Sequence, residues 1–138
     1  MKRRINEKGT ALVEFAIVLP LLIILIFGII EFGLLLFNRQ IITNACREGT
    51  RAGIVQVDPQ DTRLTDSEIS SIVNGYCASH LITFGATSDP VTTVTRVGSS
   101  FSDPLTVQVA YTYSFLVLPN FISGISGNIS VQTVMLME

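Results

Sequence analysis

Residues 9–37 have the sequence GTALVEFAIVLPLLIILIFGIIEFGLLLF, and this stretch decides where the rest of the chain lies. No charged residue occurs from Phe15 to Ile30, and the apolar run continues past Glu31 to Phe37. A helix rises about 1.5 Å per residue and must cross roughly 30 Å of hydrocarbon, so this is a membrane-spanning length. Four lysines and arginines precede it within residues 1–8, against one acid. Because basic flanks stay in the cytoplasm, we expect everything after Phe37 to lie outside.

Glu14 stands at the very start of the apolar run and breaks the membrane pattern. A carboxylate in hydrocarbon costs several kcal/mol unless it is neutralised or reaches the interface, so an ionisable residue there indicates a function. The alternative is that Glu14 lies one turn inside the headgroup layer and extends its carboxylate to water.

The residues around Glu14 favour the functional interpretation. A basic segment is followed by Gly9, then by Thr10 to Val13, then by Glu14 and the apolar run. This order resembles a type IV prepilin leader, which is cut on the cytoplasmic side before the apolar segment. An ordinary secretory signal is cut after its apolar region at a small-x-small site, and no such site closes this run. We therefore expect residues 1–9 to be a short leader.

Further strings narrow the resemblance to one family. They are Ala11–Ala16 (ALVEFA), Leu19–Leu22 (LPLL), Phe27–Gly33 (FGIIEFG) and Arg47–Gly53 (REGTRAG). Together they resemble the TadE-like proteins, which are minor pilins or pseudopilins of the tight-adherence pilus machinery. The similarity is dense from Gly9 to Gly53, and the rest of the chain agrees only in outline.

The resemblance implies a mechanism and a set of partners. A prepilin peptidase would cut between Gly9 and Thr10, and Glu14 would pair with the new Thr10 amine of a neighbouring subunit. The partners implied are that peptidase, other pilin and pseudopilin subunits, the inner-membrane assembly platform and the lipid bilayer. The chain would be a single-pass inner-membrane protein with a non-catalytic role in the fibre. Phe15 follows Glu14 where the family's major pilins carry Tyr, which favours a minor subunit.

Beyond the membrane, residues 10–52 are expected to form one long helix, with its membrane part at about 15–37. Apolar side chains keep a helical stripe after Phe37 while polar ones occupy the other faces. Residues 53–138 are left for one small outer domain. The chain after residue 9 holds 10 acids against 5 bases, so nucleic acid is not expected as a partner.

The outer domain is expected to combine a helix with a sheet. Thr65 to Glu68 forms a capping box, and apolar residues follow at helical spacing for about 16 residues. Residues 105–115 alternate apolar and polar side chains, which is typical of a strand with one buried face. Residues 91–97 and 129–137 supply two further strands. The predicted fold is α+β, with a roughly three-stranded antiparallel sheet under the two helices.

Two shorter segments complete the outer domain. Residues 53–64 are expected to be a linker with a proline-bearing turn at residues 58–61. Residues 116–122 are more apolar than a loop requires, so they either cover the open end of the sheet or contact a neighbouring subunit or the membrane.

The two cysteines lie on the apolar stripes of the two helices, Cys46 on the first and Cys77 on the second. If these helices pack antiparallel, the side chains meet, and a disulfide would close a loop of about 30 residues worth roughly 3 to 4 kcal/mol. We expect this bridge; the alternative is two buried free thiols.

Enzyme chemistry finds little support in the sequence. His80 is the only histidine, so neither a zinc site nor a hydrolytic triad has its usual residues, and we expect no metal and no cofactor. Two other classes of protein remain. One is an uncleaved, signal-anchored envelope protein whose outer domain is a binding module, and the other is a membrane-tethered enzyme.

Overall fold

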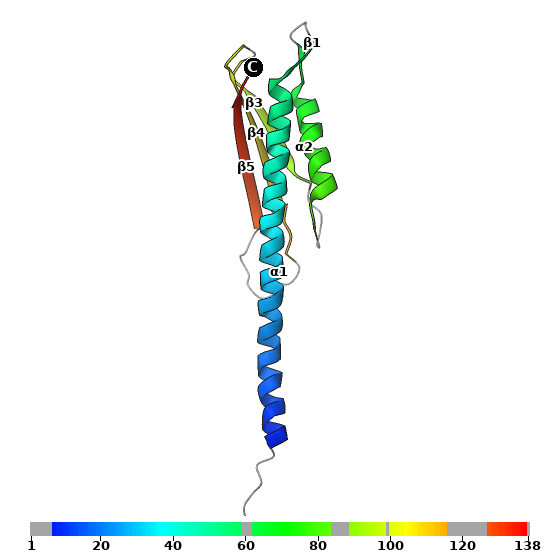
Figure 1. Ribbon diagram of the computed structural model, residues 1–138, viewed down its shortest axis with the longest axis vertical. Coiled ribbons are helices and arrows are strands. Elements are labelled where there is room, and N and C mark those ends of the chain that lie inside the picture. The colour runs from blue at the N-terminus through cyan, green and yellow to red at the C-terminus, as the bar shows by residue number, and fades with distance from the viewer. Residues whose placement is uncertain (1–6, 59–61, 84–88, 99, 116–126, 138) are drawn as a thin grey trace, which may run out of the picture.

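The computed structural model describes residues 7–58, 62–83, 89–98, 100–115 and 127–137. Its longest element is α1 (Glu7–Ile54), a continuous helix of 48 residues that contains Pro20. At 1.5 Å per residue this helix is about 72 Å long, roughly twice the hydrocarbon core of a membrane. Figure 1 shows that the N-terminal half of α1 stands free, whereas the C-terminal half packs against the rest of the chain. The long helix expected for residues 10–52 is thus present, with slightly wider bounds.

The sheet has three antiparallel strands in the order β3 (Val91–Arg96), β4 (Pro104–Tyr113) and β5 (Gly127–Leu136). The central strand β4 pairs with both neighbours in regular register, with Val107 opposite Val94 on one side and Val109 opposite Val131 on the other. Alternate residues of β4 are buried, as the period of two in the sequence predicts. The α+β fold class and the three expected strands are confirmed.

Two helices cover the buried face of this sheet. The second helix, α2 (Asp66–His80), begins at the capping box, where the Thr65 N–H donates to Glu68 Oε2 at 2.8 Å and Glu68 N–H donates to Thr65 Oγ1 at 3.3 Å. It runs beside the C-terminal half of α1 in the opposite direction (Figure 1). Side chains from both helices and from β4 form one core, centred on Ile42, Ile69 and Val107.

The structure adds a small element that the sequence did not predict. Residues expected to form a linker contain a two-stranded antiparallel ladder, β1 (Gln56–Asp58) and β2 (Thr62–Arg63). Strands of two or three residues are too short for a period of two to be recognised. The predicted turn at 58–61 falls mostly outside the described residues, and the apolar segment 116–122 and leader residues 1–6 fall wholly outside them.

Candidate functional site

The N-terminal half of α1 carries its apolar side chains on all sides of the helix. From Thr10 to Ile30 nearly every side chain is exposed, including Phe15, Ile17 and Leu21. Within the described residues, α1 is the one helix long and apolar enough to cross a membrane. A surface helix of a soluble protein has one polar face, so an all-round apolar helix requires lipid or other helices around it. This half of α1 therefore anchors the chain to a membrane.

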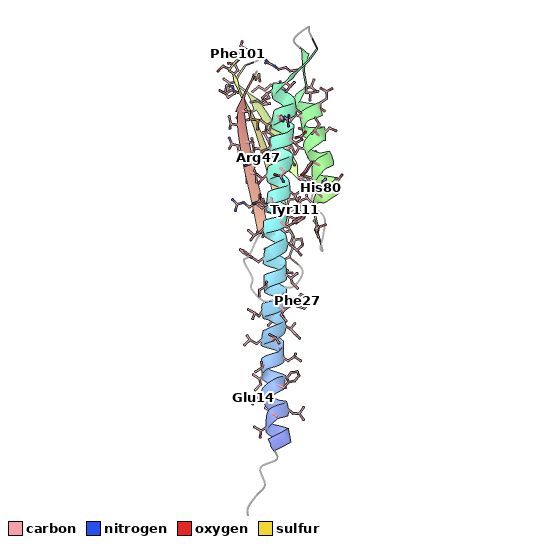
Figure 2. All side chains as sticks on the ribbon, in the orientation of Figure 1. Glu14, Phe27, Arg47, His80, Phe101 and Tyr111 are labelled. Atoms are coloured by element: carbon pink, nitrogen blue, oxygen red, sulfur yellow. The ribbon has the colours of Figure 1, made fainter. Side chains whose placement is uncertain are left out.

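The predicted processing and pairing residues lie together near the free end of α1. Gly9, Thr10 and Glu14 line one shallow groove on the helix with Val13 and Ile17. Thr10 and Glu14 are one turn apart, so they share a face. Glu14 is exposed and has no hydrogen bond or ion pair to any other described residue. Figure 2 shows it far from the outer part of the molecule, so the described residues of the outer domain offer its carboxylate no partner.

The outer part of the chain begins to cover α1 at Glu31. This residue is 3% exposed, and the side chain of Asn38, two turns further on, is fully buried. We call α1 from Glu31 onward, together with everything after it, the outer domain. The Tyr113 side chain lies close to Glu31 at the lower end of β4. Burial raises the pKa of the Tyr113 hydroxyl, and the nearby Glu31 carboxylate raises it further.

Asn38 fixes the lower end of α2 to α1. Its Nδ2 donates to the Ile82 carbonyl at 2.7 Å, and the Ile82 N–H donates to its Oδ1 at 3.0 Å. The side-chain amide therefore binds both the N–H and the C=O of Ile82, just after α2, as the backbone of a neighbouring strand would. This role was not predictable from the sequence, because an asparagine in a helix is usually exposed.

Two glycines allow α1 to approach its neighbours closely in the outer domain. A Cβ on Gly49 would lie inside van der Waals contact of the Val73 side chain, and a Cβ on Gly53 would do so with Ile69 and Leu105. Gly49 and Gly53 belong to the REGTRAG string that carries part of the family resemblance. The structure thus gives these two positions a packing role, which the sequence analysis did not assign.

The two cysteines are free thiols in the structure, so the expected disulfide is not formed. Both side chains are fully buried in the core between the antiparallel helices and the sheet. The Cys46 S–H donates to the Val107 carbonyl at 3.0 Å, which directs its sulfur to the sheet. Burial raises the pKa of the Cys77 thiol to about 11, and the neighbouring Cys46 adds to this rise. The Cys77 thiol is therefore protonated and unreactive at neutral pH.

The described residues contain no group of three or more histidine, cysteine or acidic side chains that could hold a metal ion. His80 is exposed at the end of α2, where its ring stacks on Tyr76 with 4.5 Å between ring centroids. Its Nδ1 lies 2.9 Å from the Tyr76 carbonyl oxygen. His80 is the last residue of α2, and these two contacts are both with Tyr76, one turn earlier in the same helix.

Comparison with known proteins identifies the N-terminal region. The model of the TadE-like protein family matches residues 9–51, which are nearly the whole of α1, and this confirms the resemblance found in the sequence. No curated protein and no solved structure gives a significant match to the chain.

Proposed function

Because residues 9–51 carry the TadE-like sequence, we propose that this chain is a minor pilin or pseudopilin of a tight-adherence pilus. A prepilin peptidase removes residues 1–9, and the remaining chain takes part in fibre assembly as a structural subunit without catalytic activity. Its other partners are pilin and pseudopilin subunits and the assembly platform of the inner membrane. The chain crosses that membrane once, with its N-terminus in the cytoplasm and its outer domain outside.

The observation that carries this proposal is the free half of α1. Most side chains of residues 10–30 are apolar and exposed, and they point in every direction around the helix. Such a segment is stable in lipid, and it is equally stable among the helices of other subunits. A subunit that must leave the bilayer and enter a fibre requires both properties.

The start of the outer domain at Glu31 sets the depth of the chain in the membrane. Residues 10–30 make a helix about 31 Å long, which matches the hydrocarbon thickness. A membrane segment ending at Phe37, as first expected, would draw the buried Glu31 and Asn38 and the residues packed on them into lipid. We therefore assign the membrane segment to residues 10–30.

In this arrangement Glu14 lies about 6 Å along the helix from Thr10, inside the cytoplasmic boundary of the bilayer. Cleavage after Gly9 creates a positively charged amine at Thr10. The Glu14 carboxylate of one subunit can pair with the Thr10 amine of the next, which offsets the cost of removing both charges from water. Such a pair also fixes the axial register between the two helices.

The experiment that tests the proposal is N-terminal sequencing and intact-mass measurement of the chain recovered from its host's membranes. We expect a chain that begins at Thr10. A chain that begins at Met1 would refute processing and would leave the signal-anchored binding protein as the better description. The second arm is a Glu14→Ala variant, with Val13→Ala in the same groove as its matched control. Only the glutamate variant should fail to form fibres, while both should insert in the membrane.

A further inference from the structure

The charges of the processed chain are segregated between α1 and the rest of the outer domain. Three of its five basic residues, Arg39, Arg47 and Arg51, lie on the exposed side of α1. Seven of its ten acids follow residue 54, where only two bases remain. The exposed side of α1 carries one acid, Glu48, against these three bases, so the outer half of α1 has a net positive charge on a domain that is otherwise anionic.

This cationic face is continuous with an exposed apolar one. Side chains at helical spacing form a single stripe along α1, which we call the α1 stripe: Phe32, Leu36, Arg39, Gln40, Thr43, Arg47 and Arg51. Phe32 and Leu36 are 60% and 45% exposed. The stripe begins just above the membrane segment and becomes cationic towards its outer end, where Arg47 lies beside the sheet and α2 (Figure 2). Apolar contact area with a charged margin is typical of a protein interface.

Lipid is not a suitable partner for the charged part of the stripe. The hydrocarbon ends near Ile30 and the headgroup layer extends roughly 6 Å beyond it, so Arg47 and Arg51 lie about 20 Å and about 26 Å above the lipid surface along the helix. Both distances exceed the Debye length of about 8 Å at physiological salt. The arginines therefore face an acidic protein surface of matching height.

The chain itself offers such a surface on α2. Asp66 and Glu68 lie in its first turn at the outer end, and Asp89 lies at its lower end beside Ala78 and Leu81. These three acids are exposed. Hydrogen bonds from the Thr65 backbone and side chain lower the pKa of Glu68, which keeps this carboxylate ionised. Asp66 is also paired with Arg96, so its charge is partly compensated.

The heights of the two surfaces correspond. Gly53 of α1 packs on Ile69 of α2, and Asn38 bonds to Ile82 just after α2. Arg51 therefore lies near the level of the first turn of α2, and Arg39 lies near the level of Asp89. Copies anchored in one bilayer lie at the same height. When two copies lie side by side, the arginines of one therefore face the acids of the other without an axial shift.

The surface of α2 between its acids is made of small residues. Ser67, Ser71, Gly75 and Ala78 are all exposed. Gly75 costs about 1 kcal/mol relative to alanine in a helix. Nothing within the subunit requires it, since a Cβ there would meet no atom within 4 Å. Close approach of another helix explains a glycine at this position.

We propose that the α1 stripe of one copy docks on the small-residue face of α2 in a second copy, with Arg51 opposite Glu68 and Arg39 opposite Asp89. A symmetric pair is disfavoured, because a two-fold axis along the membrane normal would bring the two cationic stripes together. The contact is therefore heterologous, and repetition of it forms an open array, as a fibre requires. This contact adds detail to the proposed function. It rests on that function only because it requires several copies of the chain side by side in one membrane.

The test uses engineered cysteines in the full-length chain. Thr43→Cys and Ala78→Cys lie at the same level on the two surfaces, and differently tagged chains carrying one each are produced together in membranes. Mild oxidation should give a mixed disulfide between them. Thr43→Cys paired with Gln132→Cys on the far face of the sheet is the matched control and should give none. Native Cys46 and Cys77 are buried and remain in every variant.

Charge-reversal variants and a bulky substitution at Gly75 distinguish this contact from chance proximity of two chains. Arg39→Glu on the first chain should reduce the mixed disulfide at least about tenfold, and Asp89→Arg on the second chain should restore it. Gly75→Leu should abolish the disulfide while leaving α2 as stable as before or more so, because leucine favours a helix. A Thr43→Cys homodimer, equal yields with the Gln132 control, or insensitivity to Gly75→Leu would each overturn the proposal. N-terminal sequencing tests processing separately, so failure of this contact would not be confused with failure of the proposed function.

Discussion

Asn38 provides the sharpest test of how the outer domain is held on α1. Substitution by alanine removes both hydrogen bonds to Ile82 and leaves a partly buried N–H and C=O without partners. Each bond contributes about 0.5–1.5 kcal/mol net, and each unsatisfied buried group costs about 1–3 kcal/mol. Because Ile82 retains some access to water, the lower part of this range applies. We expect Asn38→Ala to lower the free energy of unfolding by about 2–3 kcal/mol.

The assay is thermal and urea unfolding of the full chain in detergent micelles, followed by near-ultraviolet circular dichroism of the tyrosines. A loss of about 2–3 kcal/mol corresponds to a fall of about 10–20 °C in Tm for a domain of this size. The matched control is Asn44→Ala, an exposed asparagine on the same helix, which should change stability by less than about 0.5 kcal/mol. Hydrogen exchange should also accelerate at the Ile82 amide. Equal stabilities of the Asn38 and Asn44 variants would refute the argument that this amide joins α2 to α1.

Three further outcomes follow from packing, charge and titration. Gly49→Ala should destabilise the outer domain by about 1–2 kcal/mol, because the added Cβ meets the Val73 side chain. Gly75→Ala should stabilise it by up to about 1 kcal/mol, because alanine favours a helix and the added Cβ meets no atom. The urea midpoints of the two variants measure both changes. The free energy of unfolding should fall by up to about 2–3 kcal/mol between pH 9 and pH 11. The reason is that the pKa of the Cys77 thiol is near 9 in the unfolded chain and about 11 in the folded one. Cys77→Ala should reduce this dependence of stability on pH. Glu14→Ala should not change the urea midpoint at all, since Glu14 contacts nothing in the outer domain; a shifted midpoint would contradict its assignment to assembly.

The elements with a repeating pattern were predictable from the sequence. The length of α1 follows from its apolar run and the stripe beyond it, and β4 follows from alternation over ten residues. The start of α2 follows from a local signal, since Thr65 and Glu68 satisfy each other's backbone groups three residues apart. Each of these signals is contained within one segment of the chain.

Features that depend on contacts between distant segments were not predictable. Asn38 binds a backbone unit 44 positions away, and the packing role of Gly49 depends on Val73. The spacing of the cysteines permitted a bridge, but the structure directs the Cys46 thiol to a carbonyl of β4 and leaves both thiols free. The pairing that we propose for Thr10 and Glu14 joins two molecules, so its contacts do not lie within a single chain.

The two halves of α1 show how one helix serves two surroundings. Up to Ile30 the helix exposes apolar side chains on every side, which is typical of a helix in lipid. From Glu31 onward one side is buried against the outer domain and the other becomes increasingly polar. Backbone geometry is continuous across this boundary, so the change lies only in the side chains. Glu31, buried where the outer domain begins, opposes entry of that end of the helix into the bilayer, because a carboxylate in hydrocarbon is costly.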